Sequence, residues 1–292
     1  MATADIVEAI AAGETYIIAE IGQNHQGDIE HAKRLIEVAA NAGVNAIKSQ
    51  KRHTRTLLTD EEYNKPYDTP NAFGNTYGEH RDALELSVED HTSLKDYAES
   101  FGLAYFVSPW DPVSAAQMTE VGMPLFKIAS AGITDEDTVR AACASGVPVI
   151  ISTGMSTEEQ IDQCVGWMRN EGVKHRYVLH CTSTYPSDFK QLNLSYMNVL
   201  AERYPDCGIG FSGHHRGIAI DVAAVAMGAK IVERHFTLDR TQKGGDHAAS
   251  LGPGGLVKMV RDIRALEIAV GDGVKRIYEG EIPMLAKLRR VK

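Results

Sequence analysis

Short runs of β-branched and aromatic residues alternate with helical segments from residue 16 onward. This alternation is typical of a parallel sheet whose strands are connected by helices. The runs lie at 16–21, 46–50, 103–107, 125–128, 148–152, 176–180, 208–212 and 231–235. Eight βα units predict an α/β fold of the (β/α)8 TIM barrel type, here as a single domain over 1–292, and not an open doubly wound sheet. The nucleotide-binding patterns GxGxxG after the first strand and GxxxxGK[ST] are absent from the sequence.

The ends of several helices can be predicted from single residues. Ser156 with Glu159 fits a capping box at a helix start, and Ser87 with Asp90 is a second example. Glycines that permit a left-handed backbone are expected to end five helices, at Gly43, Gly102, Gly122, Gly146 and Gly172.

One connection, over about 51–87, is too long for a plain turn and is rich in Tyr, Asn, His and Arg. Loops of this length in a compact barrel are usually functional, so we expect it to cover the barrel mouth. The alternative is a solvated insertion that touches nothing.

Composition narrows the possible partners and the compartment. The 292 residues carry a formal net charge of -9, which argues against a nucleic acid partner. No apolar run approaches the length of a membrane span, and the first residues carry acids where a secretory signal would be basic. We therefore expect a cytoplasmic protein that does not enter a membrane. The cysteines have no metal-binding spacing and are predicted to be free thiols: Cys143, Cys164, Cys181 and Cys207.

Polar residues recur at the carboxyl ends of the predicted strands, where barrel enzymes place their chemistry. They are Glu20, Lys48, Gln50, Ser108, Lys127, Ser130, Ser152, His180, Ser212, His214, Glu233 and His235. Each lysine alone could be a salt-bridged core residue, but two lysines at two strand ends suggest an anionic substrate such as a phosphate carboxylate. His214 and His235 follow neighbouring strands and form a candidate divalent metal pair, although a strand histidine can also be simply hydrogen bonded.

Ordered motifs across the chain carry a family resemblance. They are AEIGQNHQGD at 19–28, IKSQ at 47–50, SPWD at 108–111, FKIAS at 126–130, ISTGMS at 151–156, LHCTSTYP at 179–186, GFSGHH at 210–215 and VERHFTLD at 232–239. In these segments the chain resembles the sialic acid synthase (N-acetylneuraminate synthase) family. Enzymes of that family are transferases that condense phosphoenolpyruvate with a sugar aldehyde on a TIM barrel.

The resemblance implies roles for individual residues. His214 and His235 would bind Mn²⁺ or Mg²⁺, which polarises the aldehyde, and Glu20 would lie beside the reacting carbons. Phosphoenolpyruvate would be held by Lys48, Lys127, Ser108, Ser130, Ser152, Ser183 and Ser212. Tyr185 and Asp246 match positions that touch the acceptor sugar. We also expect a homo-oligomer.

Three departures affect the acceptor side of the resemblance. The family segment GSGE reads Ala129-Ser130-Ala131-Gly132, and SDH before the first metal histidine reads Ser212-Gly213-His214. The chain stops at Lys292, about where the family's C-terminal antifreeze-like domain would begin, so we expect that domain to be lacking. These departures favour an acceptor other than N-acetylmannosamine itself, namely an N-acetylmannosamine-like or related aldose.

An arginine from that domain normally reaches the acceptor, so another cation must hold the acceptor's far end. Arg52, directly after the second strand, is our candidate, because its planar fork suits hydroxyls, carboxylates or phosphates. The alternative is that Arg52 only pairs with a nearby acid such as Asp111 or Asp82.

Two other functions compete with the synthase. The first is a Schiff-base aldolase that uses Lys127 or Lys48. The second is an inactive sugar-acid-binding paralogue, suggested by the missing carboxylate at Gly132.

Overall fold

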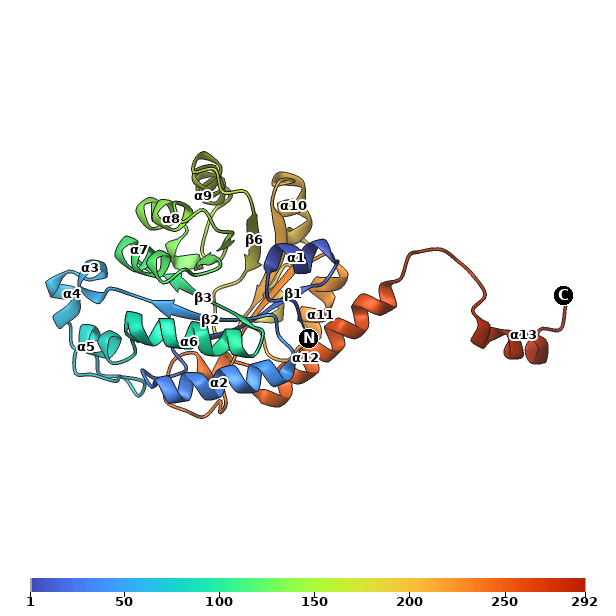
Figure 1. Ribbon diagram of the computed structural model, residues 1–292, viewed down its shortest axis with the longest axis horizontal. Helices are drawn as coiled ribbons and strands as arrows, with labels where there is room; N and C mark the ends of the chain where they lie inside the picture. Colours follow the sequence, from blue (N-terminus) through green and yellow to red (C-terminus); the bar gives the residue numbers. More distant parts are fainter. Residues whose placement is uncertain (1, 292) are drawn as a thin grey trace.

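A computed structural model describes residues 2–291 and shows a closed barrel of eight parallel strands surrounded by helices (Figure 1). The strands, in barrel order, are β1 Tyr16–Gly22, β2 Ala46–Lys51, β3 Ala104–Pro109, β4 Phe126–Ile128, β5 Val149–Ser152, β6 Arg176–Cys181, β7 Gly208–Gly213 and β8 Ile231–His235. β8 pairs with β1 and closes the barrel. The predicted (β/α)8 fold is confirmed.

Helices of eight or more residues follow β1 to β8 in turn and cover the outside of the barrel. They are α2 Ile29–Ala42, α6 Val88–Ser100, α7 Pro112–Glu120, α8 Glu136–Cys143, α9 Glu158–Asn170, α10 Tyr196–Arg203, α11 Ala219–Ala226 and α12 Pro253–Val270. Shorter helices are α1 Ile6–Ala11, α3 Thr54–Leu57, α4 Asp60–Asn64, α5 Tyr77–Asp82 and α13 Ile282–Leu288.

The predicted helix ends are confirmed with one exception. Ser87 and Asp90 form the capping box of α6. The five predicted glycines all have positive φ, between 72° and 83°. The prediction for α9 was wrong, because Thr157 caps the helix with Gln160, one residue later than the Ser156 box. The Ser156 hydroxyl instead donates to the Gly154 carbonyl at 3.1 Å.

Side-chain alternation along β8 separates a catalytic face from a structural face. Glu233 and His235 point to the barrel interior and its mouth, whereas Arg234 points outward and lies against Asp221 of α11 at 2.5 Å. Arg234 also donates to the His215 carbonyl at 2.7 Å. The outward side of β8 therefore anchors the segment that follows β7.

The connection from β2 to α6 is an ordered lid and not a solvated insertion. It carries α3, α4 and α5, and it touches the loop after β8 where Asn71 Oδ1 accepts from the Gly244 backbone at 3.2 Å. The Gln26 side chain of the first loop donates to the Lys243 carbonyl at 2.7 Å. The expected cover over the barrel mouth is thus built from three loops.

Other predictions can be checked on the same residues. All four cysteines are free. Among the helices described, none is both long and apolar enough to cross a membrane. Figure 1 shows that the segment after α12 runs away from the barrel and carries α13.

Candidate active site

A cavity of about 360 Å³ opens at the carboxyl ends of the strands. All but one of the predicted site residues line it: Glu20, Lys48, Arg52, Lys127, Ser130, Ser152, Ser183, Tyr185, Ser212, His214, His235 and Asp246. The exception is Ser108, which is fully buried and accepts a hydrogen bond from Lys48 Nζ at 2.8 Å. Its direct contact with a substrate stays a prediction.

The floor of the cavity is a cluster of two lysines and two glutamates, Lys48, Lys127, Glu20 and Glu233, each at most 5% exposed. Lys48 forms an ion pair with Glu20 and lies 3.9 Å from Glu233 Oε1. Lys127 Nζ lies 3.7 Å from the same Glu233 oxygen. Because burying a charge without a partner is costly, the four groups stabilise one another when no anion is bound.

The two carboxyls of the floor have opposite pKa shifts. Burial raises the pKa of Glu20 to about 7, despite the attraction of Lys48. Burial opposes ionisation of Glu233 too, but Lys127 and Lys48 together hold its pKa below the ordinary value. Burial lowers the pKa of Lys127. Glu20 can therefore gain or lose a proton near neutral pH, while Glu233 remains a fixed negative charge.

Hydroxyl groups line the wall above the floor. The Ser152 hydroxyl is buried and has no hydrogen-bond partner among the residues described. Ser130 Oγ accepts from the Gly154 backbone at 3.1 Å. A Cβ at Gly154 would lie 2.1 Å from Ser183 Oγ and 2.8 Å from Ser130 Oγ, so only glycine lets these hydroxyls approach. This wall can donate to a small anion above the lysines.

His214 and His235 lie together with ring centroids 5.3 Å apart. His214 Nδ1 donates to the Thr182 carbonyl at 3.0 Å, since a carbonyl can only accept, and Nε2 keeps the lone pair. Burial lowers the pKa of His235 to about 4, so its ring is neutral at pH 7. The ring of Tyr185 packs on His214 with centroids 4.2 Å apart.

The donors present fit a divalent metal ion. His235 Nδ1 is buried, has no hydrogen-bond partner within residues 2–291, and lies 3.8 Å from Asp246 Oδ2. Two imidazoles beside a carboxylate suit Mn²⁺ and related ions. Within residues 2–291, no set of three or more His, Cys, Asp or Glu side chains has metal-binding geometry. The histidine pair is therefore a candidate site whose remaining ligands would be oxygen atoms of water or substrate.

Arg52 is a buried residue of the cavity wall. Arg52 Nη1 lies 3.2 Å from Glu85 Oε1, and Nη2 donates to Gln50 Oε1 at 2.5 Å. Its guanidinium stacks on Trp110 at 4.1 Å. Arg52 lines the cavity, and its contact with an acceptor stays a prediction.

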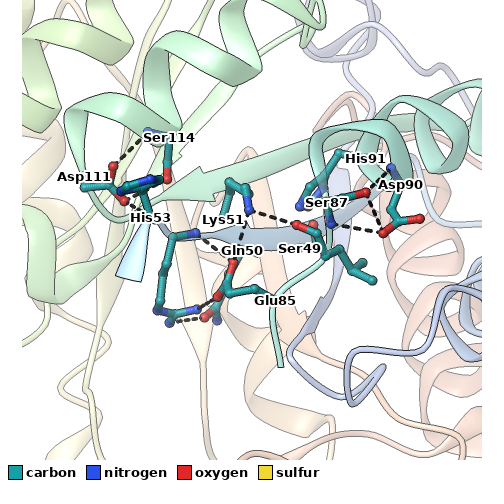
Figure 2. Close-up of polar contacts among 12 residues, drawn as sticks. Ser49, Gln50, Lys51, His53, Glu85, Ser87, Asp90, His91, Asp111 and Ser114 are labelled. Atoms are coloured by element: carbon teal, nitrogen blue, oxygen red, sulfur yellow. Dashed lines mark hydrogen bonds and ion pairs between the residues drawn. The ribbon is translucent and has the colours of Figure 1, made fainter. Parts of the chain in front are cut away.

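Arg52 does pair with an acid of the lid, as the alternative expected, but that acid is Glu85 and neither of the two named examples, Asp111 and Asp82. Asp111 accepts from the His53 backbone at 2.7 Å and from the Ser114 hydroxyl at 2.7 Å. Asp82 accepts from the Tyr63 hydroxyl at 2.6 Å. Figure 2 shows Asp111 turned toward His53 and Ser114, while Glu85 lies against Lys51. Asp111 is the N-cap of α7, a local role that a Pro at the next position signals.

Sequence reasoning missed several residues of the site. Glu233 was recognised as a strand-end acid without a role, yet it contacts both lysines and accepts from Ser212 at 3.3 Å. Cys181 lines the cavity, where His214 lowers its thiol pKa to about 7 although burial alone would raise it. Glu233 could have been assigned to the site from its position two residues before His235, because alternate residues of a strand point to the same face. Nothing in the sequence separates Cys181 from an ordinary core cysteine.

Comparisons with known proteins give one consistent result. The chain matches the model of the NeuB family over residues 35–275. The N-acetylneuraminate-9-phosphate synthase of Homo sapiens is 38% identical over 273 residues, which is 94% of this chain and 76% of that protein. The N,N'-diacetyllegionaminic acid synthase of Campylobacter jejuni is 35% identical over 271 residues, which is 92% of this chain and 81% of that protein.

A solved structure agrees with the sequence relatives. The N-acetylneuraminic acid (sialic acid) synthetase of Leptospira borgpetersenii has a TM-score of 0.79 and 32% identity to this chain. The similarity covers 95% of this chain and 93% of that one.

Proposed function

The chain belongs to the NeuB family, and we propose that it condenses phosphoenolpyruvate with a sugar aldehyde to form a nonulosonic or related 3-deoxy-2-keto sugar acid, with release of phosphate. The relatives named above are sialic acid and legionaminic acid synthases, whose products are of this class. The product of the human relative carries a phosphate at carbon 9, and the name of the Campylobacter product mentions none.

The observation that carries the proposal is the paired floor of the cavity. Phosphoenolpyruvate is small and bears a phosphate and a carboxylate, and Lys48 and Lys127 offer two buried cations below a wall of hydroxyls. When the anion binds, it can take the place of Glu20 and Glu233 as the partner of these ammonium groups. Such buried, charge-assisted contacts are the strong ones.

The residues of the cavity can then support each step of the condensation. Carbon 3 of phosphoenolpyruvate attacks the aldehyde carbon, the aldehyde oxygen becomes a hydroxyl, and positive charge develops at carbon 2. Water adds at carbon 2, one of its protons goes to the former aldehyde oxygen and the other leaves with the phosphate, and the C–O bond to phosphate breaks to leave a ketone. Glu20, with its pKa of about 7, can accept the proton of that water, and the lysines stabilise the departing phosphate.

A divalent ion completes the proposal on the acceptor side. His214 and His235 would hold Mn²⁺ or Mg²⁺, with Asp246 beside them. The ion would supply Lewis acidity toward the aldehyde oxygen. Tyr185 and Asp246 line the same end of the cavity and can contact hydroxyls of the sugar.

The two competing functions require different states of the floor residues. A Schiff-base aldolase needs a neutral lysine, and the lowered pKa of Lys127 favours that reading. The ion pair of Lys127 with Glu233 favours the charged form instead. An inactive paralogue would not need the complete set of lysines, glutamates and histidines found here. A cytoplasmic location and a homo-oligomer stay predictions from the sequence.

Phosphate release from phosphoenolpyruvate, measured across a panel of aldoses with Mn²⁺ present, tests the function. We expect release that depends on the aldose, that stops when a chelator removes the metal, and that leaves no adduct after borohydride treatment. A borohydride-trapped lysine would establish the aldolase. Absence of release with every aldose would favour the paralogue.

A further inference from the structure

Cations gather at the rim of the cavity, away from the paired floor. Arg81 lines the cavity from α5, and its charge has no acidic partner within residues 2–291. Its guanidinium donates only to neutral atoms, Gln23 Oε1 at 3.0 Å and the Tyr77 hydroxyl at 2.6 Å. Arg81 thus differs from Arg52, whose charge is offset by Glu85.

Arg81 is held in place before any ligand arrives. It stacks on Tyr77 at 4.8 Å, and its two hydrogen bonds use two of the five N–H donors of a guanidinium. The remaining donors are available to a ligand. An ordered, partly buried arginine with free donors is suited to bidentate binding of an anion.

A second cation and a polar donor lie beside Arg81. Lys243, from the loop after β8, sits over the ring of Phe73 at 4.7 Å, and Phe73 lines the cavity. His80 is the neighbour of Arg81, and its Nδ1 accepts from the Phe73 backbone at 3.1 Å, so Nε2 carries the hydrogen. Both positive charges help lower the pKa of His80, so Arg81 of the lid and Lys243 of the loop after β8 lie near the same imidazole.

A hydrogen-bonded chain along one wall connects this rim to the floor. Gln23 accepts from Arg81 and donates to Glu85 at 3.3 Å, and Glu85 binds Arg52. Arg52 donates to Gln50, which in turn donates to Glu20 at 3.1 Å. Glu20 and Arg81 therefore line one wall of the same cavity, and a ligand that reacts above Glu20 can extend along this wall toward Arg81.

We infer that Arg81 and Lys243 form an anion subsite for the acceptor, and that the acceptor is an aldose with a phosphate at the end remote from its aldehyde. This rests on the proposed function, in which the aldehyde lies near His214 and His235. Two cations without acidic partners match the charge of a phosphate dianion better than that of a single carboxylate. In a hexose acceptor the phosphate would be on carbon 6, which becomes carbon 9 of the product when three carbons are added.

The test compares an N-acetylhexosamine with its 6-phosphate, at saturating phosphoenolpyruvate and with Mn²⁺. We expect the wild-type chain to prefer the phosphorylated acceptor in kcat/KM by about 10- to 100-fold, the range of one or more charge-assisted contacts. Arg81→Met should raise KM for the phosphorylated acceptor by about that factor and leave the unphosphorylated one nearly unchanged. Arg81→Lys should retain part of the preference.

Matched controls separate a binding role from a structural one. Arg55→Met removes the same charge from the same loop, where Arg55 faces Asp60 and Tyr63 outside the cavity, and should change neither acceptor. Lys243→Met should weaken the preference less than Arg81→Met, because Lys243 is exposed. Since Lys243→Met removes no buried group, it remains informative if Arg81→Met does not fold.

The outcomes distinguish the two levels of the proposal. Turnover of both acceptors without a preference, or an Arg81→Met variant that loses both alike, would overturn the phosphate subsite and leave the synthase in place. No phosphate release with either acceptor would overturn the proposed function itself.

Discussion

Lys48 and Lys127 on the floor of the cavity are held on strands and paired with buried glutamates, whereas Arg81 and Lys243 at the rim are held on loops without acidic partners in the residues described. The floor is a self-neutralising cluster, and the rim is a net positive surface. Removing one floor charge leaves an opposite charge buried with fewer partners, while removing a rim charge leaves only solvent or neutral groups. We therefore expect floor variants to affect stability and chemistry together, and rim variants to affect the recognition of one substrate.

The largest effect is expected for Lys127→Met, because it removes a proposed phosphoenolpyruvate contact and leaves Lys48, 3.9 Å away, as the remaining lysine beside Glu233. The free energy of unfolding should fall by about 3–5 kcal/mol, the usual cost of breaking a buried pair. The value of kcat/KM for phosphoenolpyruvate should fall at least about 100-fold, with much less change in the acceptor KM.

A double variant sharpens that prediction. Lys127→Met with Glu233→Gln should recover most of the stability but not the activity, whereas the surface control Lys95→Met should change neither. Denaturant unfolding and steady-state kinetics measure both quantities. A single variant as stable as the wild type would mean that the floor is not a coupled cluster.

His235→Ala tests whether the histidine pair, His214 and His235, is a metal site. We expect Mn²⁺ binding, followed by electron paramagnetic resonance of the free ion, to weaken at least about 100-fold, since His235 is one of the two paired histidines of the candidate site. His53→Ala changes an exposed histidine elsewhere and should bind Mn²⁺ as the wild type does. Equal Mn²⁺ affinity in the His235→Ala and His53→Ala variants would show that His235 is not a ligand of the metal.

Arg52 lies between the two regions and should show an intermediate effect. Arg52→Ala should raise the acceptor KM about tenfold, because one charge-assisted contact to the sugar is lost. Glu85→Gln removes its partner and should leave the acceptor KM within about twofold, because the guanidinium remains. An unchanged acceptor KM in Arg52→Ala, with the lid still ordered, would place acceptor recognition entirely at the rim.

The smallest effect is a pH dependence of the lid. Burial, together with Arg81 and Lys243, lowers the pKa of His80 to about 4 from 6.5. The closed lid therefore holds His80 neutral, and its stability is present above pH 6.5 and lost as the pH falls toward 4. The hydrogen-exchange protection factors of residues 71–84 should fall by at most about tenfold per pH unit as the pH decreases over that interval, because one proton is taken up on opening.

A matched variant isolates this effect. In His80→Gln the same protection factors should be nearly independent of pH. Protection factors that fall equally in the variant would assign the effect to another group of the lid.

The same contrast explains what the sequence predicted. Floor residues such as Glu20, Lys48 and His235 sit at strand ends, where a side-chain period of two fixes their direction, so their convergence could be predicted before the fold was known. The eight strands themselves follow from short apolar runs that end in turn residues.

Rim residues could not be placed in this way, because loop conformation depends on contacts that are distant in sequence. Glu85 reaches Arg52 only because the lid folds back over β2, and Arg81 points inward because Gln23 and Tyr77 hold it. Local signals did exist for parts of the lid, since Thr76 and Glu79 form the capping box of α5. The same kind of signal misled at Ser156, where Thr157 and Gln160 offered an equally good box one residue later.

The most direct test of the proposed condensation follows the carbon skeleton of phosphoenolpyruvate. With substrate labelled by ¹³C at carbon 3, a suitable aldose and Mn²⁺, we predict that the label appears by NMR in a 2-keto sugar acid, next to a newly formed carbon–carbon bond, with one phosphate released per product. Label recovered only in pyruvate, with phosphate released at the same rate, would contradict the proposal and make the cavity a hydrolytic site.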